Sequence, residues 1–234
     1  MRTRTFALAA SSGAALLATV ALPATAQGGH ASHAPARADE GSVSAAALLA
    51  KVKTCDQISH GRYRTHTGTS ATVPVCGTNG AVFWKADLDV DCDGQITTAC
   101  NRSTDPWFQP ETRFHQSNGK PLSAEKLPYV VVPSPSPIWD YASAGIKGGG
   151  VVAVVYNDKV EYAVVGDTGP SAVIGEASYA TAKSLGMDPD PRTGGAESGV
   201  TYILFKNSQV EPIESHSAAA ALGAGLAQRF LASN

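Results

Sequence analysis

Two carboxyl groups nine residues apart could work as a chemical pair. Asp167 follows the strand expected over residues 159–165, and Glu176 begins the stretch 176–185, whose composition is helical. A glycine precedes each of them and leaves space around the side chain. One carboxyl group can protonate a leaving oxygen while a second activates water or attacks the bond, which is the chemistry that hydrolysis of a glycosidic bond requires.

Each carboxyl group also has a structural interpretation. Glu176 near a helix N-terminus could complement the helix dipole, and Asp167 could organise its turn. The triplet Asp167-Thr168-Gly169 also matches that of aspartic proteases, whose chemistry needs two aspartates that share one proton. Because the chain has no second triplet of this kind, a protease would require a symmetric dimer.

A second informative stretch, residues 85–112, concentrates acidic side chains. Four aspartates fall within seven residues: Asp87, Asp89, Asp91 and Asp93. They repel one another unless a metal ion, a lysine or an amino sugar supplies positive charge. Asp105 and Trp107 follow, and the indole ring could stack on a sugar or pack in the core.

The segment 89–94 (DVDCDG) begins like an EF-hand calcium loop. Position twelve of such a loop would be Cys100, where a bidentate glutamate is required, so we do not expect an EF-hand. A looser calcium site stays open. No histidine has metal-ligand spacing beside the cysteines, which disfavours a zinc site. We therefore assign no metal ligand and no cofactor.

The N-terminus and the cysteines both predict a secreted protein. Residues 1–26 combine two arginines, an uncharged apolar stretch and the cleavage pattern Ala24-Thr25-Ala26, so we expect a signal peptide; an uncleaved membrane anchor is the alternative. In an oxidising compartment four cysteines indicate two disulfide bonds, with three possible pairings. These cysteines are Cys55, Cys76, Cys92 and Cys100.

Composition divides the remaining chain into a leader and one domain. Residues 27–42 are polar, without an apolar period, and are expected to be a disordered linker. Residues 43–234 are enough for one domain with a sizeable core. After signal removal, 16 Lys and Arg face 20 Asp and Glu, a net charge of −4. This balance predicts no nucleic-acid or membrane partner, suits a cationic substrate, and we expect a monomer.

The expected elements favour a mainly β domain. Strands are expected over residues 81–85, 129–132, 149–156, 159–165 and 200–206. Helices are expected over residues 44–53, 176–185 and 217–232. Because no regular βαβ alternation appears, we expect an α+β fold in which a few helices pack on a closed or partly closed barrel.

Together these stretches resemble the fungal-type chitosanases of glycoside hydrolase family 75. The resemblance rests on GDTGPSAVIGEAS at 166–178, on DVDCDG at 89–94, on Cys100-Asn101 and on Thr104-Asp105-Pro106. It covers about residues 55–205. It implies endo-hydrolysis of the β-1,4 bonds of chitosan with inversion at the anomeric carbon. It also implies a β-barrel core, which we expect to be six-stranded, with the double-psi form as one arrangement that the strands permit.

The resemblance also implies roles for the acidic residues. Its essential pair falls on Asp167 and Glu176; we assign Glu176 as general acid, because apolar neighbours raise its pKa, and Asp167 as general base. Chitosan carries ammonium groups that acidic side chains could bind. The predicted substrate-binding residues are Asp87, Asp89, Asp91, Asp93, Asp105 and Trp107. A non-catalytic carbohydrate-binding or cell-wall module is the main alternative, and a dimeric aspartic protease is the other.

Overall fold

A run of β-branched residues forms one strand of a β-hairpin. The computed structural model describes residues 43–234, and the predicted signal peptide 1–26 and linker 27–42 lie outside the described residues. Strands β5 (Val151–Tyr156) and β6 (Lys159–Gly169) form the predicted hairpin, with Asn157 at φ 53° in its turn. Asparagine tolerates this left-handed conformation better than most residues, which is why the turn forms here.

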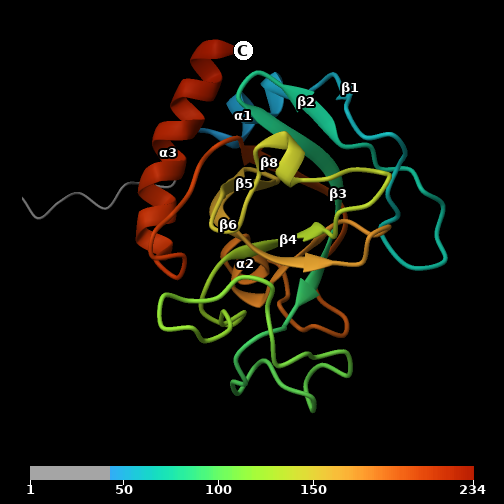
Figure 1. Ribbon diagram of the computed structural model, residues 1–234, viewed down its shortest axis with the longest axis vertical. Coiled ribbons are helices and arrows are strands. Elements are labelled where there is room, and N and C mark those ends of the chain that lie inside the picture. Colours follow the sequence, from blue (N-terminus) through green and yellow to red (C-terminus); the bar gives the residue numbers. More distant parts are fainter. Residues whose placement is uncertain (1–42) are drawn as a thin grey trace, which may run out of the picture. The chain divides into compact units, whose positions relative to one another are not determined.

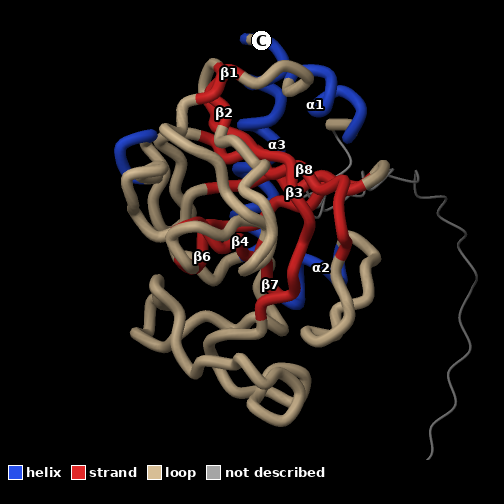
Figure 2. The backbone as a smooth tube through the Cα atoms, turned by 90° about the vertical axis from the view of Figure 1, so that its right-hand side faces the viewer, coloured by secondary structure: helices blue, strands red, loops and turns tan. Residues whose placement is uncertain are grey.

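The remaining elements follow the chain in this order: α1 (Ala45–Lys51), β1 (Asp56–Gln57), β2 (Cys76–Thr78), β3 (Ala81–Asp91), β4 (Tyr129–Pro133), η2 (Ala142–Ala144), and, after the hairpin, β7 (Glu176–Ser178), α2 (Tyr179–Ser184), β8 (Ala196–Phe205) and α3 (His216–Ser233). Between β3 and β4 the chain has no named helix or strand, and Figure 2 shows this segment as loops gathered below β7.

Six strands close into a barrel. The pairing order is β3-β7-β4-β6-β5-β8, and β8 pairs back with β3 (Figure 1). The pairs β3–β7 and β4–β6 are parallel, and the other four are antiparallel. The predicted α+β class and six-stranded barrel are therefore confirmed. The double-psi connection stays a prediction.

Both faces of the barrel strands are buried. Val151, Ala153 and Val155 of β5 pack in one apolar cluster with α1 and α3, which lie outside the barrel. Their neighbours Val152 and Val154 pack in a second cluster, which includes Trp84 and Tyr202. Burial on both faces explains why these strands are apolar throughout rather than alternating.

Two local predictions are wrong. The strand expected over residues 81–85 continues through the acidic segment to Asp91, and Glu176 begins the short strand β7 instead of a helix. Helix α2 starts three residues later, where Ser178 caps it by accepting a hydrogen bond from the Thr181 amide. Pairing of β7 with β3 outweighs the helical composition, because it satisfies backbone groups inside the barrel.

The structure selects one of the three disulfide pairings. Cys55 bonds to Cys76, and Cys92 bonds to Cys100. The second bond closes the loop that leaves the end of β3. Among residues 43–234, no helix is long and apolar enough to cross a membrane.

Candidate active site

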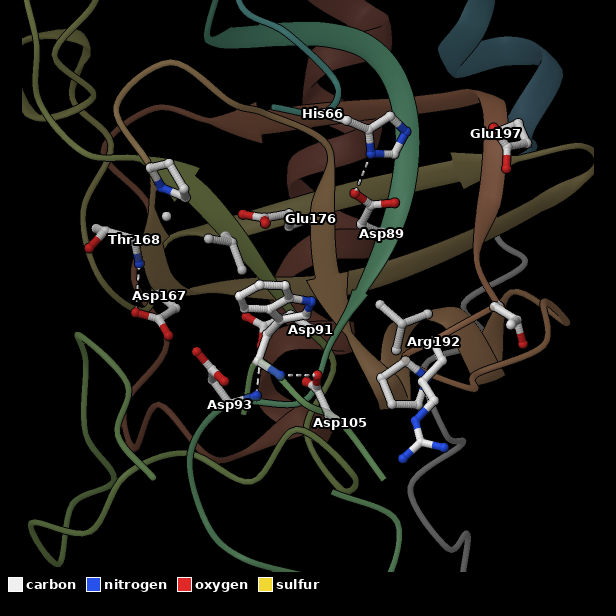
Figure 3. Close-up of a pocket in the computed structure, with 18 residues that line it drawn as sticks. His66, Asp89, Asp91, Asp93, Asp105, Asp167, Thr168, Glu176, Arg192 and Glu197 are labelled. Carbon is white, nitrogen blue, oxygen red and sulfur yellow. Dashed lines mark hydrogen bonds and ion pairs between the residues drawn. The ribbon is translucent and has the colours of Figure 1, made fainter. Parts of the chain in front are cut away.

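A cleft of about 670 Å³ opens where the ends of β3, β6 and β7 meet. Parallel pairing of β3 with β7 sets Asp89 beside Glu176, and parallel pairing of β4 with β6 sets Asp167 beside Val131. Figure 3 shows the carboxyl groups of Asp167, Glu176 and Asp93 around one hollow. The two predicted chemical residues therefore share one cleft.

Asp167 lies near the end of β6 and is held by the backbone. Its Oδ1 accepts hydrogen bonds from the amide groups of Arg113 and Thr168, each 2.7 Å long. Only 8% of the residue is exposed. Burial raises the pKa of Asp167, and the two amide donors act against that rise because they favour the charged carboxylate. The side chain is thereby fixed in orientation and supplied with donors for its anionic form.

Glu176 has a different environment. Burial raises its pKa to about 7, and the negative charges of Asp89, Asp93 and Asp167 add to the rise. Gly169 makes room for it, because a Cβ at this position would lie 2.5 Å from Oε2 of Glu176. Gly175, the preceding residue, takes a φ of +116° and packs against Asp87 instead. This carboxyl group therefore keeps its proton closer to neutral pH than an ordinary glutamate does.

The acidic wall of the cleft contains most of the predicted binding residues. Those that line it are Asp89, Asp91, Asp93, Asp105 and Trp107. Short backbone contacts order this wall: Oδ1 of Asp93 accepts from the Gln109 amide at 2.6 Å, and Oδ1 of Asp105 accepts from the Trp107 amide at 2.8 Å. The Trp107 side chain is not core, because the residue is 85% exposed.

Asp87 differs from the other predicted binding residues. It is 2% exposed and is not among the residues that line the cleft. Burial, together with the charge of Asp89, raises its pKa to about 7. Asp87 and Asp89 are two residues apart and point to the same face of β3, so strand alternation does not explain the difference. Asp87 lies farther from the strand end, and Gly175 packs directly on its Oδ1.

Comparison with known proteins identifies the family of this chain. Residues 88–233 match the family described as fungal chitosanase of glycosyl hydrolase group 75. The chain belongs to this family. The predicted resemblance is thus confirmed, and the matched region contains both Asp167 and Glu176.

Several named relatives of this group 75 chain come from Aspergillus. Endo-chitosanase C of Aspergillus oryzae is 36% identical over 131 residues, which cover 54% of this chain and 32% of the relative. Endo-chitosanase of Aspergillus oryzae (strain ATCC 42149 / RIB 40) is 34% identical over 148 residues, 58% of this chain and 60% of the relative. Endo-chitosanase of Aspergillus fumigatus is 32% identical over 178 residues, which cover 70% of this chain and 71% of the relative. The chain thus spans only about a third to three fifths of the first two relatives.

Three cleft residues of this group 75 protein carry no sequence signal: His66, Arg192 and Glu197. His66 comes from the loop before β2, and its ring contacts carboxyl groups of β3. Arg192 donates a hydrogen bond to the carbonyl of Ser103, which joins two loops that are 89 residues apart in sequence. Such contacts depend on loops far apart in the chain, so no local pattern could have indicated them.

The acidic segment at the end of β3 contributes to one group of potential metal ligands. Asp89 and Asp91 belong to strand β3, so residues 89–94 do not form an EF-hand loop, as expected. Among the described residues, His66, Asp87 and Asp89 bring one potential ligand atom each to within 4.8 Å of the others. Its histidine, His66, carries no local sequence signal for metal binding.

Proposed function

We propose that this chain is a secreted endo-acting hydrolase that cleaves the β-1,4 glucosaminidic bonds of chitosan by an inverting acid–base mechanism. The observation that carries the proposal is the contrast inside one cleft: Glu176 has a pKa of about 7, whereas Asp167 accepts two backbone hydrogen bonds. Two carboxyl groups with different environments are what an acid and a base need at the same pH. The endo-chitosanase names of the relatives supply the substrate.

In this mechanism Glu176 is the general acid and Asp167 the general base. Glu176 donates its proton to the glycosidic oxygen while the bond from that oxygen to the anomeric carbon breaks. Asp167 accepts a proton from a water molecule whose oxygen attacks the anomeric carbon from the opposite face. Each turnover therefore consumes one water and leaves the two carboxyl groups with their protonation states exchanged, and exchange with solvent restores them.

The acidic wall suits a polycationic substrate. Asp89, Asp91, Asp93 and Asp105 can bind ammonium groups of successive sugar units, and the exposed indole of Trp107 offers a flat apolar face for a sugar ring. Asp87 lies beneath this wall and is only 2% exposed, so the proposal gives it no direct contact with the ammonium groups.

Viscometry of soluble chitosan tests the activity and the assignment. The wild-type protein should thin the solution quickly, and Asp167→Asn and Glu176→Gln should each lower the rate by about 10²–10⁴-fold while binding persists. Asp158→Asn, in the exposed β5–β6 turn, is the matched control and should thin the solution normally. Full activity of both cleft variants would refute the site, and wild-type binding without thinning would favour the carbohydrate-binding module.

The stereochemistry is tested separately. Proton NMR of the first products should show the α-anomer before mutarotation, as inversion of a β-linkage requires. A β-anomer would instead show retention and would overturn the role of Asp167 as a base. An inverting pair should also have its carboxyl groups about 6.5–9.5 Å apart in a structure with a bound oligosaccharide.

Secretion is part of the same proposal. The two disulfide bonds fit an oxidising compartment, and residues 1–26 have the pattern of a cleaved signal peptide. Intact-mass measurement of protein recovered from the culture medium should give a chain that begins at Gln27. Recovery of the full-length chain in the membrane fraction would support the uncleaved anchor.

A further inference from the structure

Three side chains from two segments meet at the edge of the cleft. Nδ1 of His66 lies 3.0 Å from Oδ2 of Asp89, and Nε2 of His66 lies 3.3 Å from Oδ2 of Asp87. Figure 3 shows the ring of His66 facing Asp89 across the cleft edge. The imidazole is therefore placed between two carboxyl groups of the same strand.

Asp87 is the unusual member of this group. Its side chain is 1% exposed, and neither carboxylate oxygen has a hydrogen-bond partner among residues 43–234. The contact with His66 is close, but it lacks the geometry of a hydrogen bond. A buried carboxyl group is costly unless it is paired, hydrogen-bonded or bound to a metal ion. A metal ion held between this carboxyl group and the imidazole of His66 would meet this need.

The separation of one pair of these atoms matches two ligands of a single metal ion. Zinc lies about 2.0–2.1 Å from nitrogen and carboxylate ligands, and two ligand atoms in a tetrahedral arrangement are then about 3.3 Å apart. The distance from Nε2 of His66 to Oδ2 of Asp87 is 3.3 Å, and the ligand atoms of all three residues lie within 4.8 Å of one another. His66 and Asp89 have side chains that are 45% and 44% exposed, so an ion could enter from the cleft side.

We propose that His66, Asp87 and Asp89 bind a divalent transition-metal ion of the Zn²⁺ class. A nitrogen ligand beside two carboxylates favours such an ion over Ca²⁺, which takes oxygen ligands almost entirely. Three protein ligands leave a coordination position for water or another small ligand on the cleft side. The proposed acid–base reaction of Glu176 and Asp167 has no step that passes through this ion, and while the ion is bound the ammonium groups contact Asp91, Asp93 and Asp105 and not Asp89.

Isothermal titration of the chelator-treated protein, without a polyhistidine tag, with Zn²⁺ alone tests the site. Wild type should show a site that His66→Ala and Asp89→Asn each weaken. Removal of a group that merely orients a ligand typically weakens metal binding about 10–100-fold, so removal of a ligand should weaken it at least that much. Because both side chains are about half exposed, we expect these variants to fold like the wild type.

His115→Ala is the matched control. His115 is also half exposed and also pairs with a carboxylate, Glu111, but this pair has no third ligand and does not line the cleft. The control should bind Zn²⁺ like wild type. Thermal unfolding gives a second readout: Zn²⁺ should raise the Tm of wild type and of His115→Ala, and should not raise that of His66→Ala. Unchanged Zn²⁺ affinity in His66→Ala, or an equal loss in His115→Ala, would overturn the proposal.

Discussion

At the scale of single residues, the neighbours of a carboxyl group decide what it can do. Asp167 accepts hydrogen bonds from two amides, while Glu176 lies among other carboxyl groups in a buried position. The first environment favours the anion and the second favours the acid. The same contrast makes the pH dependence of activity a direct test of the two roles.

Activity should follow a bell-shaped pH profile. Glu176 must be protonated, so kcat/KM should fall as the pH rises through about 7. Asp167 must be ionised, so kcat/KM should also fall as the pH drops through the raised pKa of Asp167. In chelator-treated protein, Asp89→Asn removes a negative charge that raises the pKa of Glu176 and should move the alkaline limb to lower pH. Rates on soluble glucosamine oligomers, with Asp158→Asn as control, measure this. An alkaline limb that stays in place would contradict the assignment of Glu176.

Two glycines beside Glu176 should respond differently to alanine. In Gly169→Ala the new Cβ would lie 2.5 Å from Oε2 of Glu176, so the carboxyl group must move; we expect roughly 100-fold lower kcat with the unfolding free energy changed by less than about 1 kcal/mol. In Gly175→Ala the φ of +116° and a Cβ 2.0 Å from Oδ1 of Asp87 should cost at least about 1–2 kcal/mol of stability as well.

Activity assays and chemical denaturation of both glycine variants separate the two effects. A Gly169→Ala variant with wild-type kcat would show that the position of the Glu176 carboxyl group is not critical. A Gly175→Ala variant as stable as wild type would show that β3 and β7 adapt to the added methyl group.

At the scale of elements, the cleft joins a rigid part to a long loop segment. Asp167 and Glu176 stand on strands β6 and β7, whereas Asp93, Asp105 and Trp107 lie on the loops between β3 and β4. The Cys92–Cys100 bond closes the first of these loops. In the proposed reaction the two chemical groups are thus held by the barrel, and the substrate-binding groups by this loop.

Replacing Cys92 and Cys100 by alanine should affect binding more than chemistry. The eight-residue separation predicts a loss of about 2.5 kcal/mol in unfolding free energy, and KM should rise while kcat changes little. The matched control replaces Cys55 and Cys76, which are 21 residues apart and do not line the cleft: stability should fall by about 3.3 kcal/mol and KM should stay unchanged. Steady-state kinetics and denaturation measure both, and equal KM values for the two variants would contradict this division.

At the scale of the whole molecule, charge is distributed unevenly. The full chain has a net charge of only −2, with 18 Lys and Arg against 20 Asp and Glu. Seven carboxyl groups nevertheless line one cleft: Asp89, Asp91, Asp93, Asp105, Asp167, Glu176 and Glu197. Burial and, second to it, their mutual repulsion raise several pKa values, including that of Asp93 to about 6. The cleft therefore holds protons at mildly acidic pH that a cationic ligand would displace.

Binding of glucosamine oligomers should release protons. An ammonium group beside these carboxyl groups favours their charged forms and lowers their pKa values, so at about pH 5.5 binding should release protons to the buffer. Titration calorimetry of Glu176→Gln in two buffers with different ionisation enthalpies counts the protons. Fully N-acetylated oligomers, which are uncharged, are the control and should release none. Proton uptake from glucosamine oligomers would contradict the proposed role of the acidic wall.

The sequence by itself determined the elements whose signals are local. Strands β5 and β6, the turn between them and helix α3 were predicted within a few residues, because β-branched runs, turn residues and an alanine-rich stretch act over short distances. The carboxyl pair Asp167 and Glu176 was predicted from glycines, chain position and the family resemblance, and it stays a prediction; the family itself is confirmed.

Only the tertiary structure decided the features that depend on pairing between distant segments. Glu176 lies in strand β7 because β3 supplies its backbone partners, and the acidic stretch to Asp91 is strand for the same reason. Closure of the barrel also brings His66 from another loop onto Asp87 and Asp89. Local composition carries no information on these contacts, since their free energy comes from groups many residues away that meet only when the barrel closes.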